Sequence, residues 1–305
     1  MDKWIRWLVV IFIFQLSATI FSQLDFEARA EAGLPLLELK EGQQVDAIEI
    51  AAGDGKMLSI KKINQGWVIP QFNNLPADKS IVDGLVEELL SAKRNWPVAT
   101  TKNAARRFSV DEEEYKRKLT LKNGDLKLTE LYLGTSPSFR KLHTRVVGDN
   151  NIYALHITTY HASVDVSDWI DKKLLQIGKG LTEIKGRDFV LSKTDRHWNV
   201  SLLDGEEETE QKKIAVFIGK ISDIRASRLL GVDELSEIEH RQPDSIYTLL
   251  DGEKQITISL YQLENKSVVK SSLFNYYFEI PKRNLKELLD IDRKHFVTAK
   301  TKTSP

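Results

Sequence analysis

The chain has 305 residues, of which 41% are hydrophobic and 29% are charged, and it contains no cysteine. This composition suffices for one large or two modest domains with buried cores, so bulk disorder is excluded. The lack of cysteine excludes disulfides, thiolate metal sites, cysteine nucleophiles and a lipid-modified N-terminal cysteine. The 44 basic residues balance 44 acidic ones and form no local basic patch, so we expect no nucleic-acid partner.

The first 24 residues predict a helix directed to a membrane. Lys3 and Arg6 precede an apolar run over residues 7–21, which only three polar side chains interrupt. A helix of this length spans about 22 Å, and continuation to residue 24 extends it to about 27 Å, slightly less than a hydrocarbon core of about 30 Å. The run is apolar on every side and follows two cations, which disfavours a buried core helix.

Two membrane interpretations of this segment remain open, an uncleaved anchor and a cleaved signal peptide. Ile20 and Phe21 are poor cleavage positions, and the pattern Ala28-Arg29-Ala30 lies beyond charged residues, so the anchor is favoured. The positive-inside bias would keep Lys3 and Arg6 in the cytoplasm. Residues from about 25 onward are then expected on the other side of the membrane.

The remainder of the chain reads as short strands joined by tight turns. Alternating apolar residues favour strands with one buried face, and four turn dipeptides between them predict antiparallel hairpins. These dipeptides are Asp54-Gly55, Asn123-Gly124, Asp204-Gly205 and Asp251-Gly252. Apolar residues at helical spacing from Ile81 to Leu90 predict a helix that covers a sheet face, with Asp78 or Ser80 as its N-cap.

The same order of elements recurs, which favours a tandem duplication. Strands at 46–50 and 58–63, Trp67, a helix and the turn at Gly124 correspond to strands at 182–185 and 189–192, Trp198, a helix over 214–228 and the turn at Gly252. Residues 104–112 also align with residues 226–234, with identity at Ala, Arg, Val, Asp and Glu. We predict an α+β fold, in which a mainly antiparallel sheet packed by a helix is duplicated behind one N-terminal membrane helix.

This repeat predicts four parts of the chain. They are a membrane anchor or signal at residues 1–24, a first α+β repeat at 25–170, a second α+β repeat at 171–295 and a disordered tail at 296–305.

The histidines and aspartates carry no predicted catalytic or metal site. His143, His156 and His161 lack the spacing of a helical zinc motif. Asp165, Asp168 and Asp171 lack the glycine and the terminal glutamate of a calcium loop. Ser167 and Asp168 instead suit the start of a helix that ends in Lys172-Lys173, by capping and by complementing the helix dipole.

Nucleotide binding and serine hydrolysis are not predicted either. Gly53-Asp54-Gly55-Lys56 lacks the hydroxyl residue and the following helix of a phosphate-binding loop, and the segment from Gly134 to Ser138 reads as a plain loop. No Gly-x-Ser-x-Gly motif occurs. We therefore assign no catalytic, cofactor-binding or metal-binding residue.

Two further features have a structural and a functional interpretation. The acidic run from Glu206 to Glu210 predicts a solvated loop at the start of the second-repeat helix, or else a contact with a basic partner. Trp67 and Trp198 are expected to be core anchors, and the alternative is a pair of stacking platforms for sugar.

A series of turn and packing motifs, in this order and spacing over residues 45–235, resembles the bacterial domain of unknown function 4340 family. The motifs are Gly66-Trp67, Pro76-Ala77-Asp78-Lys79, Leu89-Leu90, Arg107-Phe108-Ser109-Val110-Asp111, Leu131-Tyr132-Leu133-Gly134, Thr144-Arg145-Val146, Ile152-Tyr153-Ala154-Leu155 and Trp169-Ile170-Asp171-Lys172-Lys173-Leu174-Leu175. The resemblance implies a membrane-anchored envelope protein, often an auxiliary companion of an ABC transporter of the gliding-motility type. It brings no established catalytic residues.

From the residues and the resemblance together we expect a non-catalytic protein of the bacterial inner membrane, with a single span and its body in the periplasm. It would be an auxiliary or scaffold component of an ABC-transporter-type complex, with the membrane and a protein as partners and without cofactor, nucleotide or nucleic acid. The alternative is a periplasmic module that binds cell wall or polysaccharide, and a hydrolase is less favoured.

Overall fold

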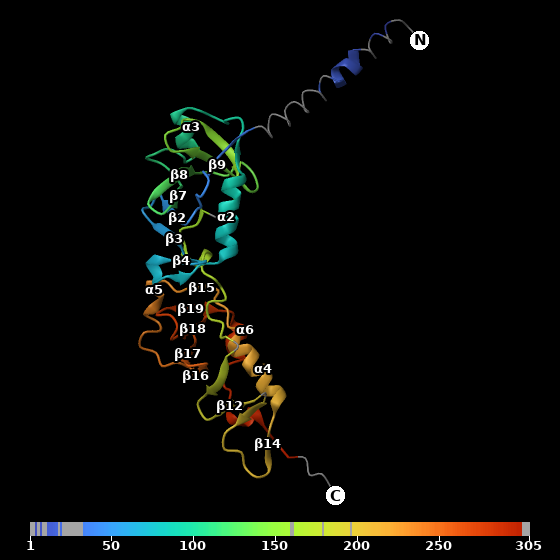
Figure 1. Ribbon diagram of the computed structural model, residues 1–305, viewed down its shortest axis with the longest axis vertical. Helices are drawn as coiled ribbons and strands as arrows, with labels where there is room; N and C mark the ends of the chain where they lie inside the picture. Colours follow the sequence, from blue (N-terminus) through green and yellow to red (C-terminus); the bar gives the residue numbers. More distant parts are fainter. Residues whose placement is uncertain are drawn as a thin grey trace. The chain divides into compact units, whose positions relative to one another are not determined.

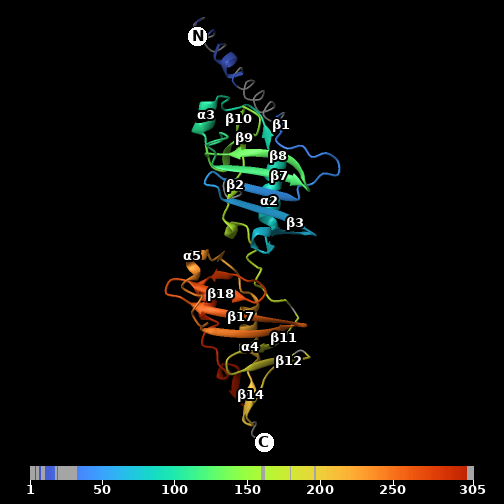
Figure 2. The same cartoon turned by 90° about the vertical axis from the view of Figure 1, so that its left-hand side faces the viewer.

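The computed structural model describes residues 33–300 except 159–161, 179 and 196, together with Trp4, Trp7, residues 11–17 and Thr19. The chain divides into two compact units, Met1–Asp165 and Val166–Pro305. Each unit is built on an eight-stranded sheet with few helices, and Figures 1 and 2 show the two sheets from two sides. The mixed α/β composition and the antiparallel strand pairing agree with the predicted fold class.

The large sheet of unit 1 has the strand order β10-β9-β8-β7-β2-β3-β4-β5. Its strands are β2 (Ala47–Ala52), β3 (Met57–Ile63), β4 (Gly66–Ile69), β5 (Leu75–Pro76), β7 (Arg117–Asn123), β8 (Leu126–Leu133), β9 (Lys141–Val146) and β10 (Ile152–His156). A second, two-stranded sheet joins β1 (Leu34–Pro35) to β6 (Lys93–Arg94). The helices are η1 (Pro70–Phe72), α2 (Lys79–Ser91) and α3 (Lys102–Arg107).

Local sequence signals set the turns and the helix start of unit 1. Gly124 closes the β7–β8 hairpin with a φ of +59°, a conformation that favours glycine, and its N–H donates to the Asp46 carboxylate at 2.8 Å. The Asp78 carboxylate accepts the Ser80 N–H at 2.9 Å, which confirms Asp78 as the N-cap of α2. Because its apolar residues share one face, α2 buries that face, and its fully buried side chains are Val82, Leu85 and Leu89.

The large sheet of unit 2 has the order β13-β12-β11-β16-β17-β18-β19-β15. Its strands are β11 (Leu181–Lys185), β12 (Val190–Thr194), β13 (His197–Val200), β15 (Arg228–Leu229), β16 (Ser245–Asp251), β17 (Lys254–Gln262), β18 (Ser267–Ser271) and β19 (Tyr277–Ile280). A separate pair joins β14 (Glu207–Thr209) to β20 (Val297–Ala299). The helices are η3 (Val166–Asp168), α4 (Gln211–Ser222), α5 (Val232–Leu235), α6 (Lys282–Lys286) and η4 (Arg293–Phe296).

The two large sheets fit the predicted duplication. The sheet of unit 1 is read from β10 and the sheet of unit 2 from β19. In both sheets the first seven strands then have the same spatial order, and corresponding strands also follow one another in the same order along the chain. The register agrees as well, because Trp67 lies opposite Lys62 in the β3–β4 hairpin and Trp198 lies opposite Lys193 in the β12–β13 hairpin. The two helices α2 and α4 follow these hairpins in the same way.

The repeats differ at one sheet edge. In unit 1, β5 pairs with β4, and the Ala77 N–H donates to the Trp67 carbonyl at 2.9 Å. In unit 2 a side chain stands in for that strand, because the Gln211 amide both donates to the Trp198 carbonyl and accepts its N–H. β13 is therefore the edge strand of its sheet, and Trp198 lies on it.

The alignment of residues 104–112 with 226–234 is wrong. Val110 and Asp111 follow the short helix α3, whereas Val232 and Glu234 lie inside α5. The strand plan pairs α3 with α5 instead, since each precedes the central hairpin of its unit. A few identical polar and small residues do not determine the register of a short helix. The second-repeat helix also ends earlier than predicted, at Ser222, and Arg228 belongs to β15.

Three local predictions in unit 2 need correction. Asp204-Gly205 does not close a hairpin, because the flanking strands β13 and β14 do not pair with each other. The acidic run is not a loop: Glu207–Thr209 pairs with Val297–Ala299, so the tail predicted at 296–305 is ordered as far as this strand, and residues 301–305 lie outside the described part. Ser167 and Asp168 lie in a 3-10 helix followed by turns rather than in an α-helix that reaches Lys173.

The predicted membrane segment at residues 1–24 lies largely outside the described residues. Its described part is helical and exposed, and the longest stretch is residues 11–17. Within the described part of the chain, we find no helix with both the length and the apolar character needed to cross a bilayer.

Candidate functional site

The duplication identifies side chains that recur at one position in both units. Arg145 on β9 lies opposite Tyr132 on β8, and Lys270 on β18 lies opposite Ser259 on β17. Tyr132 and Ser259 are equivalent positions. The β7 residue opposite Tyr132 lies as many residues before the turn glycine of its hairpin as the β16 residue opposite Ser259 does in the other unit. Each unit thus carries a cation at the same register position, and each cation lines a pocket beside the short helix α3 or α5.

In unit 1 the cation, Arg145, bonds to other parts of the same unit. The Arg145 guanidinium is buried and donates to the carbonyls of Val110 at 2.7 Å and Asp149 at 3.0 Å. It lies 4.8 Å from the Tyr132 ring centroid, in a cation–π contact. The adjoining pocket has a volume of about 220 Å³ and is lined mainly by polar groups. Arg145 therefore ties the loop after α3 to the sheet.

In unit 2 the equivalent pocket is larger, and leucine and tyrosine residues take the place of most of the charged ones. It has a volume of about 320 Å³, and its lining residues are Leu230, Leu235, Glu239, Lys270, Asn275, Tyr276 and Tyr277. The Lys270 ammonium lies 4.7 Å from the Tyr277 ring centroid. Two leucines and two tyrosines with a few charged and amide groups form an amphipathic pocket, which suits an aliphatic or aromatic side chain or a sugar ring. We call this the α5 pocket.

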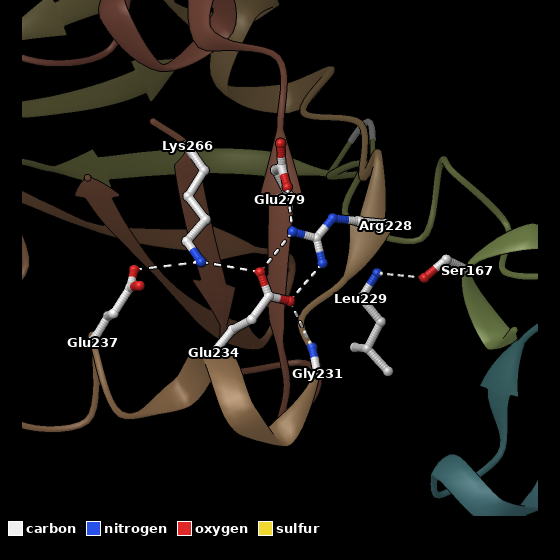
Figure 3. A network of polar contacts seen from close by, with 8 residues as sticks. All are labelled: Ser167, Arg228, Leu229, Gly231, Glu234, Glu237, Lys266 and Glu279. Carbon is white, nitrogen blue, oxygen red and sulfur yellow. Dashed lines mark hydrogen bonds and ion pairs between the residues drawn. The ribbon is translucent and has the colours of Figure 1, made fainter. Parts of the chain in front are cut away.

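An ion-pair network fixes α5 beside this pocket (Figure 3). The Arg228 guanidinium donates to both carboxylate oxygens of Glu234, at 2.6 and 2.8 Å, and also pairs with Glu279 at 2.8 Å. Glu234 further accepts the Gly231 N–H at 3.1 Å, which closes the N-terminus of α5. A bidentate pair of this kind determines the orientation of both side chains. The network therefore holds the wall of the α5 pocket that Leu235 provides.

A second cation extends the network to the β17–β18 turn. The Lys266 ammonium lies 3.0 Å from Glu234 and 3.3 Å from Glu237. On the other side, the Leu229 N–H donates to the Ser167 hydroxyl at 3.2 Å, as Figure 3 shows. Arg228 and Lys266 together hold the pKa of Glu234 well below its usual range, with the hydrogen bonds from Arg228 as the largest cause. In return, Glu234 raises the pKa of Arg228.

We expect Glu234→Gln to destabilise the protein at neutral pH but less so in acid. The folded pKa of Glu234 lies below its ordinary value of 4.5, so its stabilising effect is complete above that pH and is lost as the pH falls toward the folded value. Because these groups are partly exposed, we expect a loss of about 1–2 kcal/mol at pH 7.

The measurement is urea unfolding of both proteins from pH 7 to pH 3. The control is Glu237→Gln, which removes an exposed partner of Lys266 and should cost less than about 0.5 kcal/mol. An undiminished difference between Glu234→Gln and the wild type at pH 3 would contradict the ion-pair explanation.

The structure does not bring the predicted histidines together. His143 is buried, stacks on Phe108 at 3.9 Å between ring centroids, and lies 2.9 Å from the Thr135 hydroxyl, and burial lowers its pKa. His156 is exposed at the end of β10, and His161 lies outside the described residues. In the described ranges, no group of three or more histidine or acidic side chains is arranged to hold a metal ion.

The glycine-rich and aspartate-rich segments have local roles. Gly53-Asp54-Gly55-Lys56 forms the β2–β3 turn, where Asp54 accepts the Lys56 N–H at 3.2 Å. The segment from Gly134 to Ser138 is the loop between β8 and β9. Asp171 accepts the Lys173 N–H at 2.9 Å within a turn.

The two tryptophans differ in burial. Trp67 is 3% exposed, which confirms its prediction as a core anchor. Trp198 is only partly buried on the edge strand β13, so it is not a fully buried core residue as Trp67 is.

Sequence reasoning missed Arg145, Lys270 and the Arg228 network. The repeat contained the signal for the first two: aligning the strands outward from Gly124 and Gly252 brings Arg145 onto Lys270. For the network no comparable signal exists, because Glu279 is brought to Arg228 only by the pairing of β15 with β19.

Comparison with known proteins identifies a family but no activity. The family model described as Domain of unknown function (DUF4340) matches residues 67–243, which is more than half of the chain and includes parts of both units. No curated protein and no solved structure matches the chain. The resemblance noted from the sequence motifs is therefore confirmed, and the chain belongs to the DUF4340 family.

Proposed function

We propose that this protein is a non-catalytic, membrane-anchored companion of an ABC-transporter-type complex, with its body on the extracytoplasmic side of the inner membrane. The apolar run at residues 7–21 behind two cations supports the anchor. The resemblance of its motifs to envelope proteins that accompany such transporters supports the kind of partner. An anchor confines the body near the membrane and raises its local concentration at a membrane partner, so a modest contact surface suffices.

The α5 pocket is the observation that carries a binding role. Its leucines and tyrosines can surround a side chain of a partner, and the Arg228 network holds one wall in place without a partner. On the same short helix, Val232 is 84% exposed, so its apolar side chain is accessible to a partner.

The ionisable groups also support binding rather than acid–base catalysis. Among the described carboxylates with a shifted pKa, every shift is downward, because each accepts hydrogen bonds from a neighbouring cation or backbone N–H. These are Asp54, Asp83, Glu130, Glu207 and Glu234. A general acid needs a pKa raised toward the working pH, so these carboxylates suit ion pairs.

One observation favours the second candidate function, a module that binds cell wall or polysaccharide. Tyr276 and Tyr277 both line the α5 pocket, and aromatic faces beside amide and charged groups are suited to sugar rings. In this case the pocket would hold a saccharide rather than a protein side chain.

Crosslinking in native membranes tests the proposed partner. The full-length protein is purified after crosslinking, and we expect subunits of a membrane transporter to be recovered with it. Their recovery should be lost when residues 7–21 are replaced by a cleavable signal. Recovery of the protein without a transporter, together with retention on isolated cell wall, would overturn the companion role in favour of the second candidate.

A surface variant tests the α5 contact. Val232→Glu should lower the recovery of the partner by about tenfold, because burying a valine contributes about 1.5 kcal/mol. The matched control is Val216→Glu, at another exposed valine on α4, which should leave recovery unchanged. Equal losses in both variants would argue against the α5 surface as the contact.

A further inference from the structure

An exposed apolar patch lies on unit 1 close to where its described body begins. It consists of Leu34 on β1 and of Trp96 and Val98, which follow β6. Their exposed fractions are 66%, 66% and 50%. An exposed tryptophan beside two exposed aliphatic residues is characteristic of a surface that contacts another phase or another molecule.

The backbone keeps these three residues close to one another. Leu34 lies opposite Arg94 in the β1–β6 ladder, and Gly33 packs against Asn95. Trp96 follows two residues after Arg94, so it lies in the neighbourhood of Leu34. The Val98 N–H then donates to the Ile152 carbonyl at 2.7 Å and fastens the segment to β10.

A basic residue accompanies the patch. Arg94 lies opposite Leu34 on β6, and its guanidinium donates to the Pro35 carbonyl at 3.3 Å, which keeps this cation beside β1. Tryptophan is enriched at the interface between hydrocarbon and water, and lysine and arginine near a bilayer surface are attracted by anionic headgroups. The combination of Trp96, Leu34 and Arg94 therefore has the chemistry of a bilayer contact.

The length of the connecting chain limits how far this patch can lie from the membrane. Nine residues, 25–33, lie between Leu24, at the end of the apolar N-terminal segment, and Leu34. Even when fully extended, the chain from Leu24 to Leu34 spans at most about 36 Å. If the apolar segment is anchored, Leu34, Trp96 and Val98 cannot leave the neighbourhood of the bilayer.

We infer that the Leu34–Trp96–Val98 patch rests on the surface of the bilayer, with Trp96 in the headgroup region and Arg94 against anionic lipids. This inference rests on the proposed membrane anchor and adds a second point of attachment. Two attachments restrict the rotation of unit 1 about its tether and present the same face of the unit to a membrane partner.

Single-cysteine labelling tests this directly, because the chain has no cysteine of its own. Full-length Val98→Cys, Phe14→Cys and Met57→Cys proteins are labelled with an environment-sensitive fluorophore and reconstituted into vesicles of phosphatidylethanolamine and phosphatidylglycerol. Phe14 lies in the apolar run and reports on the anchor, whereas Met57 is an exposed apolar residue on β3 and serves as the water-exposed control. Lipids with a nitroxide on the headgroup or deep in the acyl chain quench whichever label they reach.

We expect the Val98→Cys label to show blue-shifted emission and quenching by headgroup nitroxides, whereas the Met57→Cys label behaves as in water. Adding Leu34→Glu and Trp96→Glu to Val98→Cys should abolish both effects while the Phe14→Cys label stays quenched by acyl-chain nitroxides. Leu126→Glu, at an exposed leucine in the β7–β8 hairpin, should change nothing.

The possible failures can be told apart. A lipid-quenched Phe14 label with a water-exposed Val98 label would overturn the surface contact and leave the anchor intact. A blue-shifted Val98 label that lipids do not quench would mean that a protein, such as a second copy of the chain, covers the patch, which also overturns the inference. A Phe14 label that no lipid quenches would refute the anchor and the inference together.

Discussion

Replacing Trp67 by alanine should lower the free energy of unfolding of unit 1 by about 3–5 kcal/mol, whereas Trp198→Ala should cost unit 2 only about 1–2 kcal/mol. The two residues occupy equivalent positions in their hairpins, opposite Lys62 and Lys193. Only Trp67 is buried, and its indole N–H donates to the Asp83 carboxylate at 2.8 Å. The alanine variant loses that hydrogen bond and leaves a cavity, whereas an edge-strand tryptophan gives up less buried area.

The pair of variants forms its own control, because the chemistry of the substitution and the register of the site are the same. Since the chain has two units, urea unfolding should be followed by hydrogen exchange with mass spectrometry, which assigns the loss of protection to β4 or to β13. Equal destabilisation of the two units would contradict the difference in burial and would mean that Trp198 is also a core residue.

Phe296→Ala should destabilise unit 2 by about 3–5 kcal/mol, although the residue lies near the C-terminus. The Phe296 ring is fully buried and packs edge-on against Phe189 at 4.8 Å and in a tilted arrangement against Phe217 at 5.1 Å between centroids. Phe217 in turn contacts Tyr247 at 5.4 Å, so the four rings form one cluster beneath α4. Removing Phe296 takes away one quarter of this cluster and opens a cavity.

The neighbouring exposed histidine is the matched control. His295→Ala keeps the backbone bond to Asp292 that begins η4 and should change stability by less than about 0.5 kcal/mol. Hydrogen exchange should also show loss of protection at Glu210 in Phe296→Ala, because its N–H donates to the Phe296 carbonyl at 2.8 Å. A small effect of Phe296→Ala would mean that the C-terminal segment merely covers a core that is complete without it.

The two repeats have the same strand order, but equivalent residues in them have different roles. At equivalent register positions, Arg145 is buried and bonded to two carbonyls, whereas Lys270 lines a pocket that remains accessible. We propose that unit 1 attaches to the bilayer through its apolar patch and that unit 2 engages the partner. The surface variants Trp96→Glu and Val232→Glu separate these two roles, since each removes one contact from a full-length chain.

Much of the fold was predictable from short-range signals. The glycines at the β2–β3, β7–β8 and β16–β17 turns have φ between +59°, at Gly124, and +86°. Glycine tolerates this conformation, so its position in the sequence identifies each turn without any tertiary information. Asp78 caps α2 through a bond to Ser80, two residues away. The repeat was visible for the same reason, because hairpins and a helix cap are encoded within a few residues of chain.

What the sequence by itself determined is therefore the set of hairpins, the antiparallel sheets, the buried face of α2 and the family of the chain. Only the tertiary structure decided that β14 pairs with β20, that Glu234 meets Arg228 and Lys266, and that α5, rather than the aligned residues 226–229, is the counterpart of α3. Each of these contacts joins segments whose own patterns are compatible with several partners. Which of these partners a segment pairs with depends on the loop-closure entropy and the packing of the whole unit, and a local sequence pattern does not contain this information.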